Sequence, residues 1–236
     1  NRSRKTFTSK RKKGRLKKIM IHTRRSKQPD DNFIRITTGL DVGPFNKLLS
    51  DKPELWDEIE ARQKASNSAH KDTKCIFVRG PLKMSHYYVM FDLGAYDYPC
   101  MDYLADELVP LLKPVLDWLE VKELGRVLVV NLEPGGHVDA HDDQGLYADY
   151  YARFHLVLQS NKGCSQTCGD QRQEFNVGDV WWFDHKKEHT ADNKGNDNRV
   201  HIIFDAVTNL FPMSGVPVTD EDEDKLIEYG VSYDRH

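Results

Sequence analysis

The segment RVLVVNLEPGGHVDAHDD, residues 126–143, joins an apolar run to a dense polar cluster. Residues 126–132 are rich in Val and Leu and predict a β-strand, which the Pro-Gly-Gly that follows would end. Two histidines and three aspartates then fall within residues 137–143. Such a cluster directly after a strand is either a metal site or a polar loop, and the rest of the chain has to decide between them.

Further short strands are predicted downstream of this segment. Residues 152–160 and 198–207 are apolar and β-branched, and residues 173–184 contain two short strands around Gly178. Turns rich in Gly, Asn and Asp join them, and no helical period is visible between residues 123 and 210. This spacing predicts a compact all-β unit over 123–210, either a sandwich or a barrel.

The chain before this unit predicts mainly helices. Residues 53–65 read as a short helix that begins at a proline, and residues 75–80 as a strand ended by Gly-Pro. Residues 101–121 have the apolar spacing of an amphipathic helix, which Pro110 and Pro114 should kink or divide.

The charge distribution adds two flanking segments. Residues 1–28 contain thirteen Lys and Arg and no acid, which leaves 21 basic and 37 acidic residues in the rest of the chain. We therefore expect a basic arm over 1–31, which is a solvated tail, a contact for nucleic acid or another polyanion, or a transit peptide. Residues 32–122 should pack on the core at 123–210, and an acidic segment, 211–236, should contain a helix capped by Thr219.

Composition excludes several classes of protein. No apolar run approaches 18 residues and no signal-peptide core is visible, so we expect a soluble, intracellular protein without a membrane span. Four cysteines are too few for a disulfide scaffold in 236 residues. Cys164 and Cys168 would share one face of a strand, as a bridge or as a thiol pair, and we expect a structural role for them.

The polar cluster has the spacing of metal ligands. A histidine and a carboxylate two residues apart on an extended segment, such as His141 and Asp143, point to the same side. A third ligand should come from a distant strand, and His189 follows the predicted strand at 173–184. Two histidines and one carboxylate form the facial triad of non-haem Fe(II) oxygenases. By pattern alone His137 and Asp139 rival His141 and Asp143, and His185 is better explained as a turn residue.

Basic residues on two later strands strengthen this interpretation. Arg199 could bind the distal carboxylate of 2-oxoglutarate, because a guanidinium offers a bidentate fork. Arg153 and His155 alternate with apolar residues on one strand, as Arg199 and His201 do on another, and a core containing all four would be costly without an anion or a metal. One of Trp181 and Trp182 should pack in the core while the other lines the mouth of the site.

Several motifs between residues 126 and 207 resemble, in order, those of the aspartyl/asparaginyl β-hydroxylase family of 2-oxoglutarate- and iron-dependent oxygenases. The matching segments are PGGHVDAHDD (134–143), ARFHLVL (152–158), GCSQTC (163–168), VGDVWWFDHKKEH (177–189) and NRVHIIFDA (198–206). Residues 70–80 are loosely similar to the family's upstream strand.

The resemblance implies a mainly β protein with flanking helices, built on a double-stranded β-helix, the cupin-like jelly roll. It implies Fe(II), 2-oxoglutarate and O2 as cofactor and cosubstrates. Iron would be bound by His141 and His189, with Arg199 on the distal carboxylate of 2-oxoglutarate and Arg153 and His155 holding the cosubstrate near the metal. The resemblance also favours His141 over His137 as the ligand.

Two positions differ from the best-known animal members. These have a glycine where this chain has Asp143, so a complete triad is expected here. They also use a serine on the strand before the metal loop, at a position near Val130 or Asn131, where Asn131 could substitute. His137, His201, Trp181 and Trp182 are the candidates for the substrate pocket.

The function implied is hydroxylation of an amino-acid side chain, in a protein or in a free amino acid, with decarboxylation of 2-oxoglutarate to succinate. The alternative is a structural or assembly protein, in which a jelly-roll module is attached to a polyanion by the basic arm.

Overall fold

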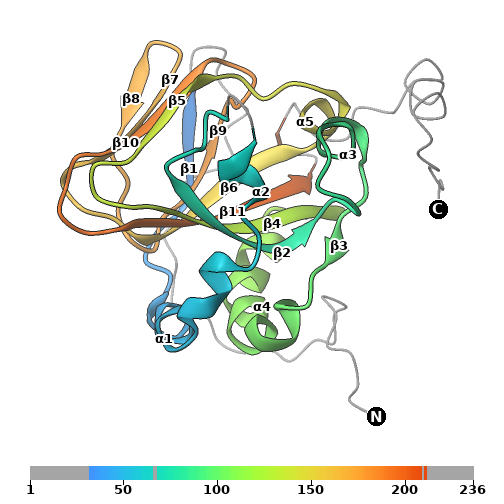
Figure 1. Ribbon diagram of the computed structural model, residues 1–236, viewed down its shortest axis with the longest axis horizontal. Helices are drawn as coiled ribbons and strands as arrows, with labels where there is room; N and C mark the ends of the chain where they lie inside the picture. The colour runs from blue at the N-terminus through green and yellow to red at the C-terminus, as the bar shows by residue number, and fades with distance from the viewer. Residues whose placement is uncertain (1–31, 66–67, 209, 212–236) are drawn as a thin grey trace.

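The computed structural model describes residues 32–65, 68–208 and 210–211, which form two antiparallel sheets flanked by helices (Figure 1). The helical elements are α1 (Gly43–Asp51), the 3-10 helix η1 (Pro53–Asp57), α2 (Ala61–Lys64), α3 (His86–Phe91), α4 (Met101–Trp118) and α5 (Leu146–Tyr150). The strands are β1 (Phe33–Thr37), β2 (Thr73–Gly80), β3 (Tyr96–Asp97), β4 (Glu123–Leu132), β5 (His137–His141), β6 (Ala152–Gln159), β7 (Cys164–Cys168), β8 (Gln171–Gln173), β9 (Val180–Phe183), β10 (His189–Asn193) and β11 (Arg199–Val207).

The order of the strands is that of a jelly roll. The large sheet has the order β1-β9-β6-β11-β4-β2-β3, and the small sheet has the order β5-β10-β7-β8. From β4 to β11 the chain passes back and forth between the two sheets, with β4, β6, β9 and β11 in the large one. The predicted fold class, a double-stranded β-helix with flanking helices, is confirmed.

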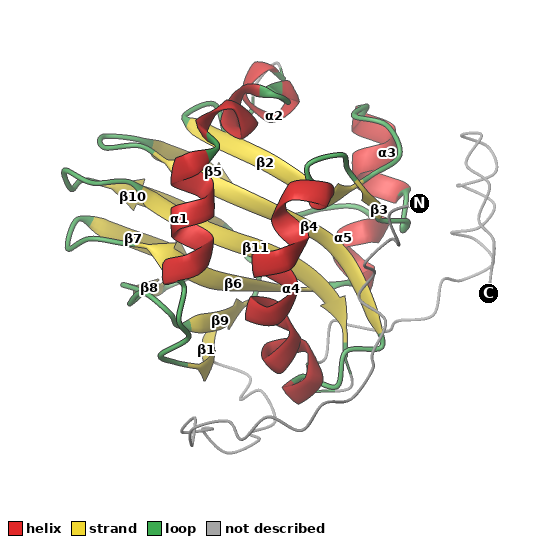
Figure 2. Ribbon diagram, turned by 90° about the horizontal axis from the view of Figure 1, so that it is seen from below, coloured by secondary structure: helices red, strands yellow, loops and turns green. Residues whose placement is uncertain are grey.

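Helices cover one face of the large sheet, and the small sheet lies on the other. Figure 2 shows α1 and α4 lying across the large sheet. Leu108 of α4 packs in one core cluster with Val127 and Val129 of β4. Because side chains alternate along a strand, Leu128 and Val130 point to the opposite face, toward the small sheet. This inner side contains the cavities described below.

Helix α4 runs from Met101 to Trp118 without interruption, so Pro110 and Pro114 do not divide it. Leu104, Leu108 and Leu112 form a continuous, fully buried stripe. Neither proline is part of that stripe. Proline has no N–H, so the carbonyl four residues before each one loses its helical hydrogen bond and can bind water instead. Burial of the apolar face therefore outweighs the local cost of the prolines.

Other predicted boundaries were wrong. Residues 53–65 form two short elements, η1, which buries Leu55, and α2, in which no residue is fully buried. The helix α5 lies inside the region expected to be free of helices. Strands β5 and β10, which are rich in polar residues, were not predicted.

The basic arm at 1–31 and the acidic helix expected beyond residue 211 lie outside the described residues. Among the residues that the structure does describe, no helix is both long and apolar enough to cross a membrane.

Candidate metal centre

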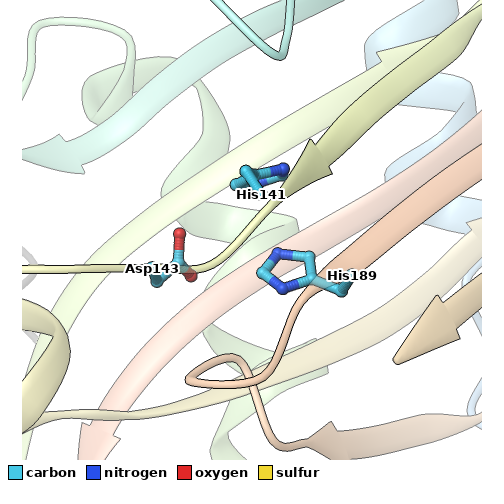
Figure 3. Close-up of side chains that lie close together, drawn as sticks. All are labelled: His141, Asp143 and His189. Atoms are coloured by element: carbon cyan, nitrogen blue, oxygen red, sulfur yellow. The ribbon is translucent and has the colours of Figure 1, made fainter. Parts of the chain in front are cut away.

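The side chains of His141, Asp143 and His189 lie close together at one end of the β5–β10 strand pair (Figure 3). One ligand atom from each residue lies within 4.8 Å of the others. His141 ends β5 and His189 begins β10, and the two residues are direct cross-strand partners beside a bulge in the ladder. Asp143 follows in the loop after β5. Three groups of the type that binds Fe(II) are therefore held by one strand pair and its adjoining loop.

Backbone carbonyls orient both imidazoles. The Nδ1–H of His141 donates to the carbonyl of Asp139 at 2.8 Å, and that of His189 donates to the carbonyl of Lys187 at 2.9 Å. Since a carbonyl can only accept, each Nδ1 must carry the proton, which leaves the lone pair of each Nε2 available. Burial also lowers the pKa of His189 to about 4, so its ring is neutral at physiological pH. The residues present thus fit a divalent metal ion.

Asp143 is held in its ionised form by Arg153. Burial acts to raise the pKa of this carboxyl, but Arg153 and the neighbouring histidines, His185 foremost, lower it well below its usual range. Arg153 Nη1 donates to Asp143, while its Nε and Nη2 donate to the two oxygens of Asp205 at 2.8 and 3.1 Å. Tyr147 also donates to Asp205, at 3.1 Å. Arg153 therefore joins the candidate metal ligand to a buried carboxylate on β11.

We expect Asp205→Asn to weaken metal binding by about 10- to 100-fold, because Asp205 fixes Arg153 and Arg153 fixes Asp143. The measurement is a titration of the folded protein with Mn(II). Asp117→Asn, on the exposed side of α4, is the control and should bind the metal like the wild type. Unchanged Mn(II) affinity in Asp205→Asn would show that Arg153 orients Asp143 without its help.

A small cavity of about 50 Å³ lies beside the three ligands and is lined by Arg153, His155 and Arg199. Arg199 is only 4% exposed, and burial lowers its pKa to about 10. Its Nη2 donates to Gln166 at 3.0 Å, its Nε has no hydrogen-bond partner, and no carboxylate of the described residues lies within ion-pair distance. A buried cation without a counter-ion is costly, so the cavity is suited to an anion.

Two histidines complete the polar face next to Arg199. The Nδ1 atoms of His155 and His201 lie 3.3 Å apart, and both Nε2 atoms are buried without a partner among the described residues. Burial and then Arg199 lower the pKa of both rings well below 6.5. Both imidazoles are therefore neutral in the folded protein.

The stability of the protein should fall as the pH falls below about 6.5. The pKa of these histidines is lower in the folded than in the unfolded state, so unfolding takes up protons in this range. Each histidine that must stay neutral contributes a slope of up to about 1.4 kcal/mol per pH unit. Urea unfolding between neutral pH and about pH 5 measures this slope, which should be shallower in His201→Phe. An equal slope in the variant would contradict the assignment.

Five predicted site residues line neither cavity. Asn131 is on the opposite face of β4 from Val130, which does line the cavity, so strand alternation rules out contact with a cosubstrate there. Trp182 packs in the core against Phe211. Trp181 contacts Phe175 on the inner face and lines neither cavity, so its place at the mouth of the site stays a prediction.

The remaining histidines have structural contacts. His137 pairs with Asp192 at 2.9 Å and lines neither cavity, and neither does His201. His185 lies in a turn, as expected, but is buried and bonded to the carbonyl of Ala148 at 3.0 Å. Its own carbonyl accepts the N–H of Asp143, so the turn positions the candidate ligand.

Sequence reasoning missed Arg62, His70 and Gln166, which also line the small cavity. The His70 ring meets the His141 ring edge-on, with centroids 4.6 Å apart. The loose similarity at residues 70–80 was the one signal that pointed to this region.

The two cysteines in β7 do not form a disulfide. Cys164 Sγ lies 3.3 Å from the side-chain oxygen of Asn193, and Cys168 Sγ donates to the carbonyl of Asp184 at 3.2 Å. Both are buried, and both contacts tie β7 to its surroundings.

Comparison with curated proteins finds one enzyme with a related sequence. The L-proline cis-4-hydroxylase of Rhizobium meliloti (strain 1021) is 28% identical over 99 residues, which are 40% of this chain and 35% of that enzyme. The matched part is therefore about a third of the length of the curated relative.

The solved structures that match this chain are more distant in sequence. An oxidoreductase of the 2OG-Fe(II) oxygenase family from Burkholderia pseudomallei is 9% identical, with a TM-score of 0.48 over 74% of this chain and 84% of that one. A predicted oxalate decarboxylase from Thermotoga maritima is 15% identical, with a TM-score of 0.30 over 40% of this chain and 72% of that one.

The family model described as Aspartyl/Asparaginyl beta-hydroxylase matches residues 55–209. This range includes every strand from β2 to β11, the three candidate ligands and Arg199, and it covers well over half of the sequence. The chain belongs to the aspartyl/asparaginyl β-hydroxylase family.

Proposed function

We propose that this protein is a 2-oxoglutarate- and Fe(II)-dependent hydroxylase that acts on an amino-acid side chain. The observation that carries the proposal is the convergence of His141, Asp143 and His189 beside a buried, unpaired guanidinium. Family membership and the similarity to a proline hydroxylase support it.

In this proposal His141, His189 and Asp143 hold the iron. The two imidazoles would bind through Nε2, because backbone carbonyls already occupy their Nδ1 protons. Asp143 would bind as a carboxylate, kept ionised by Arg153. Iron and 2-oxoglutarate together supply the oxidising chemistry, in which dioxygen is consumed and 2-oxoglutarate is decarboxylated to succinate.

Arg199 would bind the distal carboxylate of 2-oxoglutarate. Gln166 accepts a hydrogen bond from its Nη2 and so fixes the guanidinium plane, which leaves Nε to donate to the ligand. The surrounding apolar residues, Val130, Phe183 and Ile203, keep water from the pair and so strengthen it. His155 lines the same cavity and could donate from its unpartnered Nε2.

Arg153 has a different role in this proposal from the one its motif implies. Its nitrogens are already engaged by Asp143 and Asp205, so it positions a metal ligand first. A contact between Arg153 and 2-oxoglutarate stays a prediction.

The substrate would enter from a second cavity of about 460 Å³, which Arg62, His70 and Arg153 join to the first. This volume suits an amino acid or one side chain of a peptide. The alternative, an assembly protein tethered by residues 1–28, depends on a segment outside the described residues, and no contact among the residues that are described favours it.

The proposal is tested by mixing the iron-loaded protein with 2-oxoglutarate in air and measuring succinate. A panel of amino acids and peptides is then added to find those that stimulate its formation. We expect measurable succinate that depends on iron. Failure to bind iron and 2-oxoglutarate, together with no succinate with any member of the panel, would refute the proposal.

A further inference from the structure

The larger cavity contains an arginine whose charge no described residue neutralises. Arg62, on α2, lines both this cavity and the small one beside the metal ligands. Its Nη2 donates to Nε2 of His70 at 3.0 Å, and its Nη1 is buried without a hydrogen-bond partner. No carboxylate of the described residues lies within ion-pair distance of it. A buried donor on a cation without a counter-ion favours the binding of an anion.

The pairing with His70 keeps this charge in place. A guanidinium can only donate, so Nε2 of His70 must accept and the ring proton must be on Nδ1. His70 is therefore neutral and orients Arg62 without cancelling its charge.

The two other arginines in the larger cavity are already engaged. Arg153 is paired with Asp143 and Asp205. Arg126 donates from both terminal nitrogens to three backbone carbonyls at and next to α3, and it stacks 3.5 Å above the ring centre of Tyr147. Arg126 keeps only its Nε without a hydrogen-bond partner, whereas Arg62 keeps a terminal nitrogen, Nη1, available to a carboxylate.

Much of the remaining wall is apolar. Phe77 and Leu128 come from the large sheet, and Met84, Val89 and Met90 come from α3 and the segment before it. An occupant that suits this cavity has an anionic head and an apolar body.

Resting on the proposed function, we infer that the substrate is held in the larger cavity by a free carboxylate bound to Arg62, with its apolar part against the α3 wall. The carboxylate would lie close to the metal site, because the ring of His70 packs against that of the candidate ligand His141. A nearby carbon of the substrate is then presented to the site of oxidation. The carboxylate could be the α-carboxylate of a free amino acid or the side chain of an acidic residue in a peptide.

The test compares acids with their amides. Protein loaded with Mn(II) and the unreactive analogue N-oxalylglycine is titrated by calorimetry with the common L-amino acids, their C-terminal amides, and aspartate and glutamate blocked at both ends. We expect at least one carboxylate to bind about 10- to 100-fold more tightly than its amide, the range for a charge-assisted, bidentate pair.

The same titrations with Arg62→Gln should remove this preference. Arg172→Gln, at an exposed arginine on β8, is the matched control and should keep it. Tighter binding of the blocked acidic residues would identify a side-chain carboxylate as the source, and tighter binding of free amino acids would identify the α-carboxylate.

Equal binding of acid and amide throughout the panel would overturn the inference, and so would a preference that survives in Arg62→Gln. The comparison in the wild type needs no variant, so misfolding of Arg62→Gln cannot obscure it. Titrations repeated without metal or analogue test the carboxylate site alone. Failure of Mn(II) and N-oxalylglycine to bind would instead count against the proposed function.

Discussion

His189→Ala is expected to lower Fe(II) affinity and 2-oxoglutarate turnover by at least about 1000-fold, since loss of groups that merely orient a ligand already costs about 10- to 100-fold. His141→Ala should behave in the same way. Each substitution removes one of the two Nε2 atoms that are oriented to bind the metal. The remaining residues cannot complete the coordination of the ion. Metal content after dialysis against Fe(II), together with succinate formation, measures the effect.

His137→Ala is the matched control for this experiment. His137 belongs to the rival His-x-Asp pair on the same strand, but it contacts Asp192 and lies outside both cavities. We expect its variant to retain iron and activity. Iron retained in His189→Ala, or lost in His137→Ala, would show that the ligands are assigned to the wrong pair. Circular dichroism establishes that each variant is folded.

Arg199→Met is expected to abolish measurable binding of 2-oxoglutarate, with a loss of affinity of about 100-fold or more, because a desolvated, bidentate ion pair disappears. The free protein should nevertheless melt at a temperature no lower than the wild type. In the absence of ligand Arg199 is a buried cation whose lowered pKa reports the cost of its burial, and Met removes that cost.

Thermal melts with and without N-oxalylglycine separate these two effects. The wild type should be stabilised by the analogue, and Arg199→Met should not respond. Arg199→Lys keeps the charge but loses the two parallel donors of the guanidinium, so N-oxalylglycine should stabilise this variant only weakly. A full response of Arg199→Met to the analogue would place the distal carboxylate elsewhere.

The large sheet could be predicted from the sequence because one of its faces packs on helices. Strands β4, β6 and β11 bury alternate apolar residues against α1 and α4, and that burial leaves a clear pattern. The small sheet has no such pattern. Segments such as HVDAH in β5 and HTADN in β10 expose polar side chains to the site, so they read as loops.

The triad and Arg199 could be predicted because each of them lies in a short segment with a recognisable motif. Arg62 and His70 could not, since they reach the site through the tertiary fold. The N–H of Asp139 donates to the carbonyl of Ala69 at 3.0 Å, and this contact docks the turn before β2 against β5. A single sequence contains no sign of it. The sequence also left Val130 and Asn131 open as the position before the metal loop, and a shift of one residue along a strand reverses the face.

The direct pairing of His141 with His189 on neighbouring strands has a consequence for how the protein matures. If β5 and β10 were misaligned by a single residue, one imidazole would turn away from the other and no ion could bridge them. A bound ion would therefore cross-link only the correct alignment and select it from competing ones during folding. Supply of iron in the cell would then influence how much of the chain reaches its native state, in addition to how much of it is active.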